Sequence, residues 1–164
     1  MKSGAYKVTT QSIMPVYQTT KSVRHSADKM LKLVSDVERY PEFVPLCRSL
    51  TVHSRTREGN QEVLVANMTV AYKLINETFT SHVTIDHEKY SIVARYIDGP
   101  FRELENIWSF EDMPEGCKIN FYIDYEFRSR ALQLLMGTVF DKAIRKFTDA
   151  FEERAYVVFG PPST

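Results

Sequence analysis

The hydrophobic pattern near the C-terminus changes its period at Phe127, and this change constrains the fold strongly. Every second residue from Cys117 to Phe127 is apolar, which indicates a β-strand with one buried face. From Leu132 onward apolar residues recur every three or four positions, which indicates one amphipathic helix of roughly 28 residues, about 42 Å long. Such a helix needs a broad apolar surface to cover, and the strands before it supply one. Its apolar stripe consists of Leu132, Leu135, Met136, Val139, Phe140, Ala143, Ile144, Phe147, Phe151, Ala155 and Val158.

Length and composition indicate one globular domain. A chain of 164 residues is long enough to bury a substantial core. Its formal net charge is +0 at pH 7, so no global field favours nucleic acid or an acidic substrate. The two cysteines, Cys47 and Cys117, belong to no Cys-x-x-Cys or Cys/His pattern, and we expect reduced thiols in a cytoplasmic protein. No apolar run approaches the roughly 18 residues of a membrane span.

The expected domain extends over residues 14–160. Residues 1–13 are polar, follow no hydrophobic pattern and lack the apolar centre of a signal peptide, so we expect a disordered or leader segment. Met14 and Pro15 follow, and the first strand is expected from Val16 to Arg24. Residues 161–164 are expected to form a short tail.

Turn signals divide the middle of the chain into short elements. Ser26 suits the N-cap of a helix that ends at Tyr40, because the residue before Pro41 avoids the helical conformation. A brief helix or turn follows up to Leu46. Short connections rich in Gly, Pro, Asn and Asp then separate six strands and favour antiparallel hairpins. These strands are expected at 47–57, 61–71, 74–86, 90–97, 104–112 and 117–127.

The element order predicts an α+β fold of the helix-grip type. A strongly twisted antiparallel sheet wraps around the long C-terminal helix, and the short helices close one end. A curved sheet and a straight helix do not match in shape over their full length. The expected result is an internal apolar cavity.

Alternation assigns an aromatic-rich wall to the inner face of the sheet. Each side chain there either fills the core or lines a small-molecule pocket, which is typically apolar with a few polar groups. Glu77 and Ser81 interrupt the apolar face of the strand at 74–86. Glu77, Asn106 and the hydroxyls of Tyr96 and Tyr125 are the candidate polar groups. The candidate wall residues are Met68, Phe79, Tyr96, Trp108, Phe110, Phe121, Ile123 and Tyr125.

No catalytic or metal-binding motif is visible. His82 and His87 do not have the spacing of a metal pair, and His25 and His53 have no Cys or carboxylate partner nearby in sequence. The chain contains no Gly-x-Ser-x-Gly, phosphate-binding or dinucleotide-binding motif. We therefore predict no metal site and assign no catalytic residue. A catalytic triad formed by residues distant in the sequence stays an open alternative.

Five segments together resemble the coenzyme-Q-binding branch of the START-like (polyketide cyclase/dehydrase) superfamily. The resemblance extends from about Val16 to Gly160, and the joint order of the motifs is more specific than any one of them. It implies a START-like, Bet v 1-like helix-grip fold. The segments are Asp36–Cys47, Asp98–Phe101, Leu104–Phe110, Tyr125–Ser129 and Ala150–Ala155.

This resemblance implies ubiquinone as the bound ligand, with no cofactor required. Mitochondrial members of the branch are regarded as non-catalytic lipid carriers or chaperones that support respiration. The aromatic wall then suits the quinone ring, and Met136, Phe140, Ile144 and Phe147 suit the isoprenoid tail. The resemblance also implies that Tyr40–Leu46 and Asp98–Arg102 act as lids through which the ligand enters. Their apolar residues Phe43, Val44 and Phe101 would then touch the ligand or a membrane.

A basic stretch around the start and middle of the long helix favours a different function. The branch also contains the bacterial RatA toxins, described as binding the large ribosomal subunit and blocking subunit joining. A basic patch suits ribosomal RNA or an anionic membrane surface, although an ordinary solvated helix face has the same composition. A polyketide-cyclase-like enzyme is the third alternative. Of the three functions, the lipid carrier is favoured. A carrier of this kind is expected in the cytoplasm and at the surface of the inner membrane. The patch consists of Arg128, Arg130, Lys142, Arg145 and Lys146.

Overall fold

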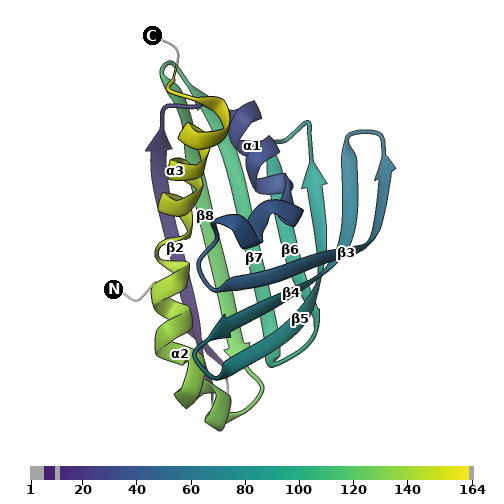
Figure 1. Cartoon of the computed structure of the whole chain (residues 1–164), viewed down its shortest axis with the longest axis vertical. Coiled ribbons are helices and arrows are strands. Elements are labelled where there is room, and N and C mark those ends of the chain that lie inside the picture. The colour runs from purple at the N-terminus through teal and green to yellow at the C-terminus, as the bar shows by residue number, and fades with distance from the viewer. Residues whose placement is uncertain (1–5, 10–11, 163–164) are drawn as a thin grey trace.

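A curved antiparallel sheet wraps around two C-terminal helices in the computed structural model, which describes residues 6–9 and 12–162 (Figure 1). The strand order is β1-β2-β8-β7-β6-β5-β4-β3. The strands are β1 (Tyr6–Thr9), β2 (Ser12–Val23), β3 (Cys47–Glu58), β4 (Gln61–Tyr72), β5 (Ile75–Asp86), β6 (Ser91–Asp98), β7 (Phe101–Met113) and β8 (Gly116–Phe127). The helices are α1 (Ala27–Ser35), the 3-10 helix η1 (Val37–Glu42), α2 (Arg130–Ile144) and α3 (Phe147–Phe159).

The predicted helix-grip fold is confirmed. Strands β3 to β8 follow one another as antiparallel hairpins, each close to its expected range. The chain begins on the other side of β8, where β2 pairs from Val16 opposite Asp124 to Val23 opposite Cys117. Strand β8 therefore lies between β2 and β7, and helices α1 and α2 pack against it. Its inward residues from Cys117 to Phe127 are all buried, as the alternation predicted.

The N-terminal expectation requires a correction. The structure places Tyr6–Thr9 in β1, which pairs antiparallel with the start of β2, so these four residues form a strand where a disordered or leader segment was expected. Strand β2 begins at Ser12, earlier than the predicted Val16. Backbone pairing explains the difference, because a ladder of N–H and C=O groups requires no apolar alternation. Residues 1–5 and 10–11 of the expected leader, and 163–164 of the expected tail, lie outside the described residues.

The C-terminal helix is divided, where the sequence predicted one continuous helix. Helix α2 ends at Ile144 and α3 begins at Phe147. The Lys146 N–H donates to the Ala143 carbonyl at 3.0 Å, a 3-10 step that interrupts the α-helical hydrogen bonds. A short break of this kind contains no Gly or Pro and keeps the apolar stripe in phase, so the periodicity could not reveal it. Two stripe residues are nevertheless exposed, Leu135 at 64 % and Val158 at 50 %.

The core lies between the concave face of the sheet and the helices. Ser26 caps α1 as predicted, with its hydroxyl accepting from the Lys29 N–H at 3.2 Å. The apolar stripe of α1 is buried through Met30, Leu31 and Val34. Helices α2 and α3 run along β8 and β2 in Figure 1, with α1 beside α3. The helices thus close the open side of the sheet and enclose the space described next.

Candidate ligand-binding cavity

An apolar cavity of about 110 Å³ lies between the sheet, the C-terminal helices and the segment 37–46. An apolar space of this order holds a ring the size of benzene. From the helices and the segment 37–46 it is lined by Val37, Tyr40, Val44, Pro45, Leu46, Phe140, Ala143, Phe147 and Phe151. From the strands it is lined by Leu50, Ala66, Met68, Val70, Phe79, Ser81, Val83, Ile92, Ala94, Leu104, Asn106, Trp108 and Ile123.

The candidate ligand residues divide into two groups. Phe121 and Tyr125 illustrate those that pack behind the lining: the Phe121 ring lies 4.7 Å from Trp108, and the Tyr125 ring lies 4.9 Å from Phe140. Alternation identifies the inner face of a sheet, but it does not separate a cavity wall from the core around it. The residues that line the cavity are Met68, Phe79, Trp108, Ile123, Phe140 and Phe147. Those outside its lining are Phe43, Tyr96, Phe110, Phe121, Tyr125, Met136 and Ile144.

The polar groups near the cavity are largely paired within the protein. The Trp108 ring N–H donates to the Asn106 side-chain oxygen at 3.0 Å, and the Asn106 amide donates to the Tyr122 carbonyl at 2.9 Å. Tyr96 lies outside the lining, and its hydroxyl accepts from the Phe101 N–H at 3.2 Å. Glu77 also lies outside the lining. Of the four candidate polar groups, the cavity therefore reaches Asn106 alone.

Several lining residues were missed from the sequence. Strand β3 supplies Leu50, although its alternation is disturbed by register shifts at Cys47/Ser49 and at Val52/Ser54. Tyr40 belongs to η1, where it was read as a helix stop, and its hydroxyl donates to the Val34 carbonyl. Burial raises the pKa of Tyr40 well above its usual range. The hydrogen bond to Val34 holds the Tyr40 ring in the wall of the cavity.

The cover segment, residues 37–46, is held against α3 by aromatic and charged contacts. The Phe151 ring lies 5.3 Å from Tyr40 and 5.0 Å from Phe43. Arg154 forms an ion pair with Glu42, and its guanidinium lies 4.9 Å from the Phe43 ring. Hydrogen bonds from Arg39 and Arg154 lower the pKa of Glu42. These contacts close one wall of the cavity.

The second expected lid is not a loop over the cavity. Phe101 begins β7, is only 1 % exposed and packs against the rings of Phe79, Phe127 and Phe140. It does not line the cavity. The Gly99-Pro100 turn that precedes it resembles a flexible loop in sequence, whereas the residue after it is a core anchor. The prediction for Asp98–Arg102 is therefore wrong.

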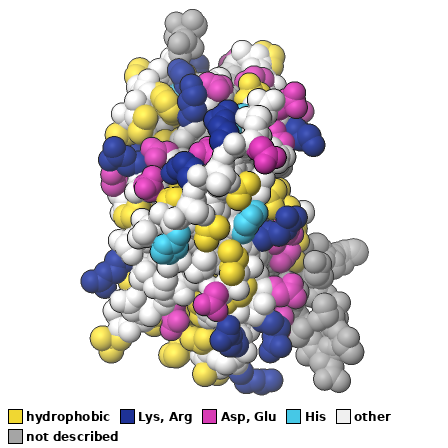
Figure 2. All heavy atoms as spheres, turned by 90° about the vertical axis from the view of Figure 1, so that its right-hand side faces the viewer, with side chains coloured by type: hydrophobic (Ala, Val, Ile, Leu, Met, Phe, Trp, Pro, Cys, Tyr) yellow, Lys and Arg dark blue, Asp and Glu magenta, His cyan; other side chains and the backbone are white. Residues whose placement is uncertain are grey.

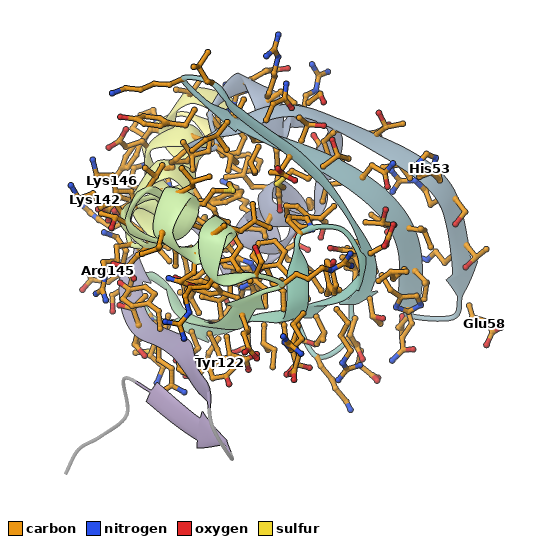
Figure 3. All side chains as sticks on the ribbon, turned by 90° about the horizontal axis from the view of Figure 1, so that it is seen from below. His53, Glu58, Tyr122, Lys142, Arg145 and Lys146 are labelled. Carbon is orange, nitrogen blue, oxygen red and sulfur yellow. The ribbon has the colours of Figure 1, made fainter. Side chains whose placement is uncertain are left out.

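The five basic residues are exposed as the helix pattern suggested. Arg145 pairs with Asp141 at 3.0 Å and lies over the Tyr17 ring at 4.7 Å. Lys142, Arg145 and Lys146 project together at one edge of the molecule (Figure 3). Figure 2 shows a different face, on which both signs of charge are interspersed. Three of the five basic residues therefore lie near the junction of α2 and α3, where Asp141 and Asp149 also lie.

The thiols and histidines form no reactive cluster in the described part of the chain. Burial raises the pKa of Cys47 to about 11 and that of Cys117 to about 12, so both stay protonated near neutral pH. His25 is buried, with Nε2 2.9 Å from the Gly160 carbonyl oxygen. Among the described residues, no three His, Cys, Asp or Glu side chains gather as a metal site. No helix in the described ranges is long and apolar enough to cross a membrane.

Two curated proteins are similar to most of this chain. The ribosome association toxin RatA of Escherichia coli strain K12 is 34% identical over 148 residues, which cover 90% of each chain. The mitochondrial coenzyme Q-binding protein COQ10 of Drosophila melanogaster is 32% identical over 152 residues, which cover 90% of this chain and 61% of that protein. The names of these relatives thus point to two different partners.

Solved structures with low sequence identity share the fold. The Zhui aromatase/cyclase of a Streptomyces species has a TM-score of 0.75 at 15% identity, and the match covers 92% of this chain and 99% of the other. A START superfamily protein from Mycobacterium smegmatis has a TM-score of 0.71 at 19% identity, covering 87% and 98%. Residues 23–152 match the family described as polyketide cyclase / dehydrase and lipid transport. The chain belongs to this family.

Proposed function

We propose that the cavity binds an isoprenoid quinone such as ubiquinone, and that the chain acts as a non-catalytic carrier or chaperone of this lipid in support of respiration. The apolar cavity carries the proposal, because it offers a ring-sized space lined mainly by apolar side chains. The pairing of Tyr40, Asn106 and Trp108 within the protein favours binding over catalysis. The similarity to COQ10 supports the choice of quinone.

The size of the cavity limits how the ligand is held. A ring fits within about 110 Å³, whereas a long isoprenoid tail does not. The tail therefore extends beyond the cavity, and binding a long-chain quinone requires the cover segment or α2 to shift. Each CH₂ buried in this way contributes about 0.8 kcal/mol, so a few isoprene units stabilise the complex substantially. Affinity should rise with the first isoprene units and then level off.

The single tryptophan provides a direct readout. Trp108 lines the cavity, so a quinone bound there should quench its fluorescence. Replacing Ala66, which lines the cavity, with Leu should weaken short-chain ubiquinone at least about tenfold, because the added carbons occupy the ring's space. The measurement is a fluorescence titration of both proteins.

Ala71 supplies the matched control for this variant. It lies on the same strand, β4, but outside the cavity lining. Ala71→Leu should keep the affinity of the unmodified chain. Equal quinone affinity in the unmodified chain, Ala66→Leu and Ala71→Leu would place the ligand elsewhere.

Ribosome binding is the second candidate, and the exposed basic charge favours it. Among the described residues, Arg128, Arg130, Lys142 and Lys146 form no ion pair, so their charges are available to phosphate groups. The similarity to RatA supports this partner. A contact of this kind is largely electrostatic and weakens steeply as the salt concentration rises.

Co-sedimentation with large ribosomal subunits at low and high salt tests this candidate. Replacing the four unpaired cations with Gln should abolish salt-sensitive binding if ribosomes are the partner, while quinone affinity stays unchanged. The matched control is a second variant, in which four exposed basic residues outside the patch are replaced with Gln. Sedimentation lost equally in both variants would show non-specific attraction. Specific loss, together with no quinone binding, would favour the ribosome over the carrier. The control cations are Arg24, Arg48, Arg57 and Lys89.

A further inference from the structure

Ser81 places an unpaired hydroxyl inside the cavity. The residue is 8 % exposed and lies on β5 between Phe79 and Val83, which also line the cavity. Its side chain forms no hydrogen bond with another described residue. By contrast, the adjacent Thr80 hydroxyl on the opposite face of β5 donates to the Asn67 side-chain oxygen at 2.6 Å. A hydroxyl without a protein partner in the wall of an apolar cavity is free to form a hydrogen bond with a ligand atom.

The other polar side chains of the lining are already engaged. Tyr40 donates its hydroxyl hydrogen to Val34, and Trp108 donates its ring N–H to Asn106. The Asn106 amide donates in turn to the Tyr122 carbonyl. Ser81 therefore keeps a hydroxyl hydrogen available in a space that is otherwise apolar.

The local backbone favours a positioned hydroxyl. Thr80 pairs with Asp98 while Ser81 pairs with Tyr96, so Ile97 is an extra residue in β6 between the partners of Thr80 and Ser81. A bulge of this kind bends the strand and changes the direction of nearby side chains, and bulges are frequent next to binding sites. A water molecule would need two to four polar partners, which the largely apolar lining supplies poorly. A ligand with one oxygen at this position fits better.

We propose that the Ser81 hydroxyl donates a hydrogen bond to a carbonyl oxygen on the ring of the bound ligand, and thereby selects a ring ketone or quinone over a plain hydrocarbon. This inference rests on the proposed function, because it assigns a polar contact within the same cavity. It makes Ser81 a specificity-determining residue with no catalytic task. The sequence carried one signal for it, the interruption of an apolar strand face.

The test compares two probes on the full-length protein by isothermal titration calorimetry. One is a short-chain ubiquinone, and the other is geranylbenzene, which has a ring and an isoprenoid tail but no oxygen. Ser81→Ala should weaken the quinone about five- to tenfold, the effect of one net hydrogen bond, and leave geranylbenzene unchanged. Its melting temperature should stay equal or rise, because no partner in the protein is lost.

Thr80→Ala is the matched control, since it removes a hydroxyl from the neighbouring residue on the outer face. It should lower the melting temperature and leave both affinities unchanged. If Ser81→Ala weakens both probes equally or neither, the role of Ser81 is wrong while the proposed function stands. If the unmodified chain binds neither probe, the proposed function fails, and the role of Ser81 fails with it.

Discussion

Removal of residues 128–164 is expected to abolish folding. These residues supply both C-terminal helices, whose buried side chains include Met136, Phe140, Ile144 and Phe151. Each contributes roughly 1.5–3 kcal/mol through burial, so their loss is comparable to the typical total stability of about 5–15 kcal/mol. The truncation also uncovers the concave face of the sheet, including Trp108. Near-UV circular dichroism and a thermal melt of the 1–127 fragment measure the effect.

A chain that ends at Pro162 is the control for this truncation. It keeps both helices and the contact between His25 and the Gly160 carbonyl, so it should melt like the full chain. A soluble 1–127 fragment that melts cooperatively would contradict the packing of the helices on the sheet.

Replacing Phe101 with Ala is expected to lower the free energy of unfolding by about 3–5 kcal/mol. The ring is almost fully buried and packs against Phe79, Phe127 and Phe140, at centroid distances of 5.4, 4.8 and 5.4 Å. Its removal leaves a void that the surrounding aromatic rings cannot fill without shifting. Equilibrium unfolding in urea measures the change.

Leu134→Ala provides the comparison, because Leu134 on α2 is 79 % exposed. It should change the free energy of unfolding by less than about 0.5 kcal/mol. A Phe101→Ala variant as stable as Leu134→Ala would contradict the position of Phe101 in the core. It would favour the lid loop that the sequence predicted at Asp98–Arg102.

The sequence determined the sheet more completely than the site. Strand β8 alternates strictly because its inner face is buried while its outer face, except for Asp124, is partly exposed, so residues such as Ile119 and Phe121 could be assigned from their spacing alone. Turn residues such as Gly59 located the hairpins. The partner of β2 could not be inferred, because its pairing with β8 joins segments about 100 residues apart.

The site was harder to predict, because a cavity is a property of packing between elements. Phe121 and Trp108 have the same inward pattern, yet the structure puts Trp108 on the cavity surface and Phe121 behind it. Tyr40 lines the cavity only because η1 packs on α3 through Phe151. The break between α2 and α3 left no trace in the apolar stripe, since a short 3-10 step preserves its phase.

Lipid extraction from the purified full-length protein, followed by mass spectrometry, tests directly whether the chain carries an isoprenoid quinone. A bound quinone with an isoprenoid tail is expected in the unmodified chain and in Ala71→Leu, and much less of it in Ala66→Leu. Protein that carries no isoprenoid quinone, and takes none up when offered it, would contradict the proposed function.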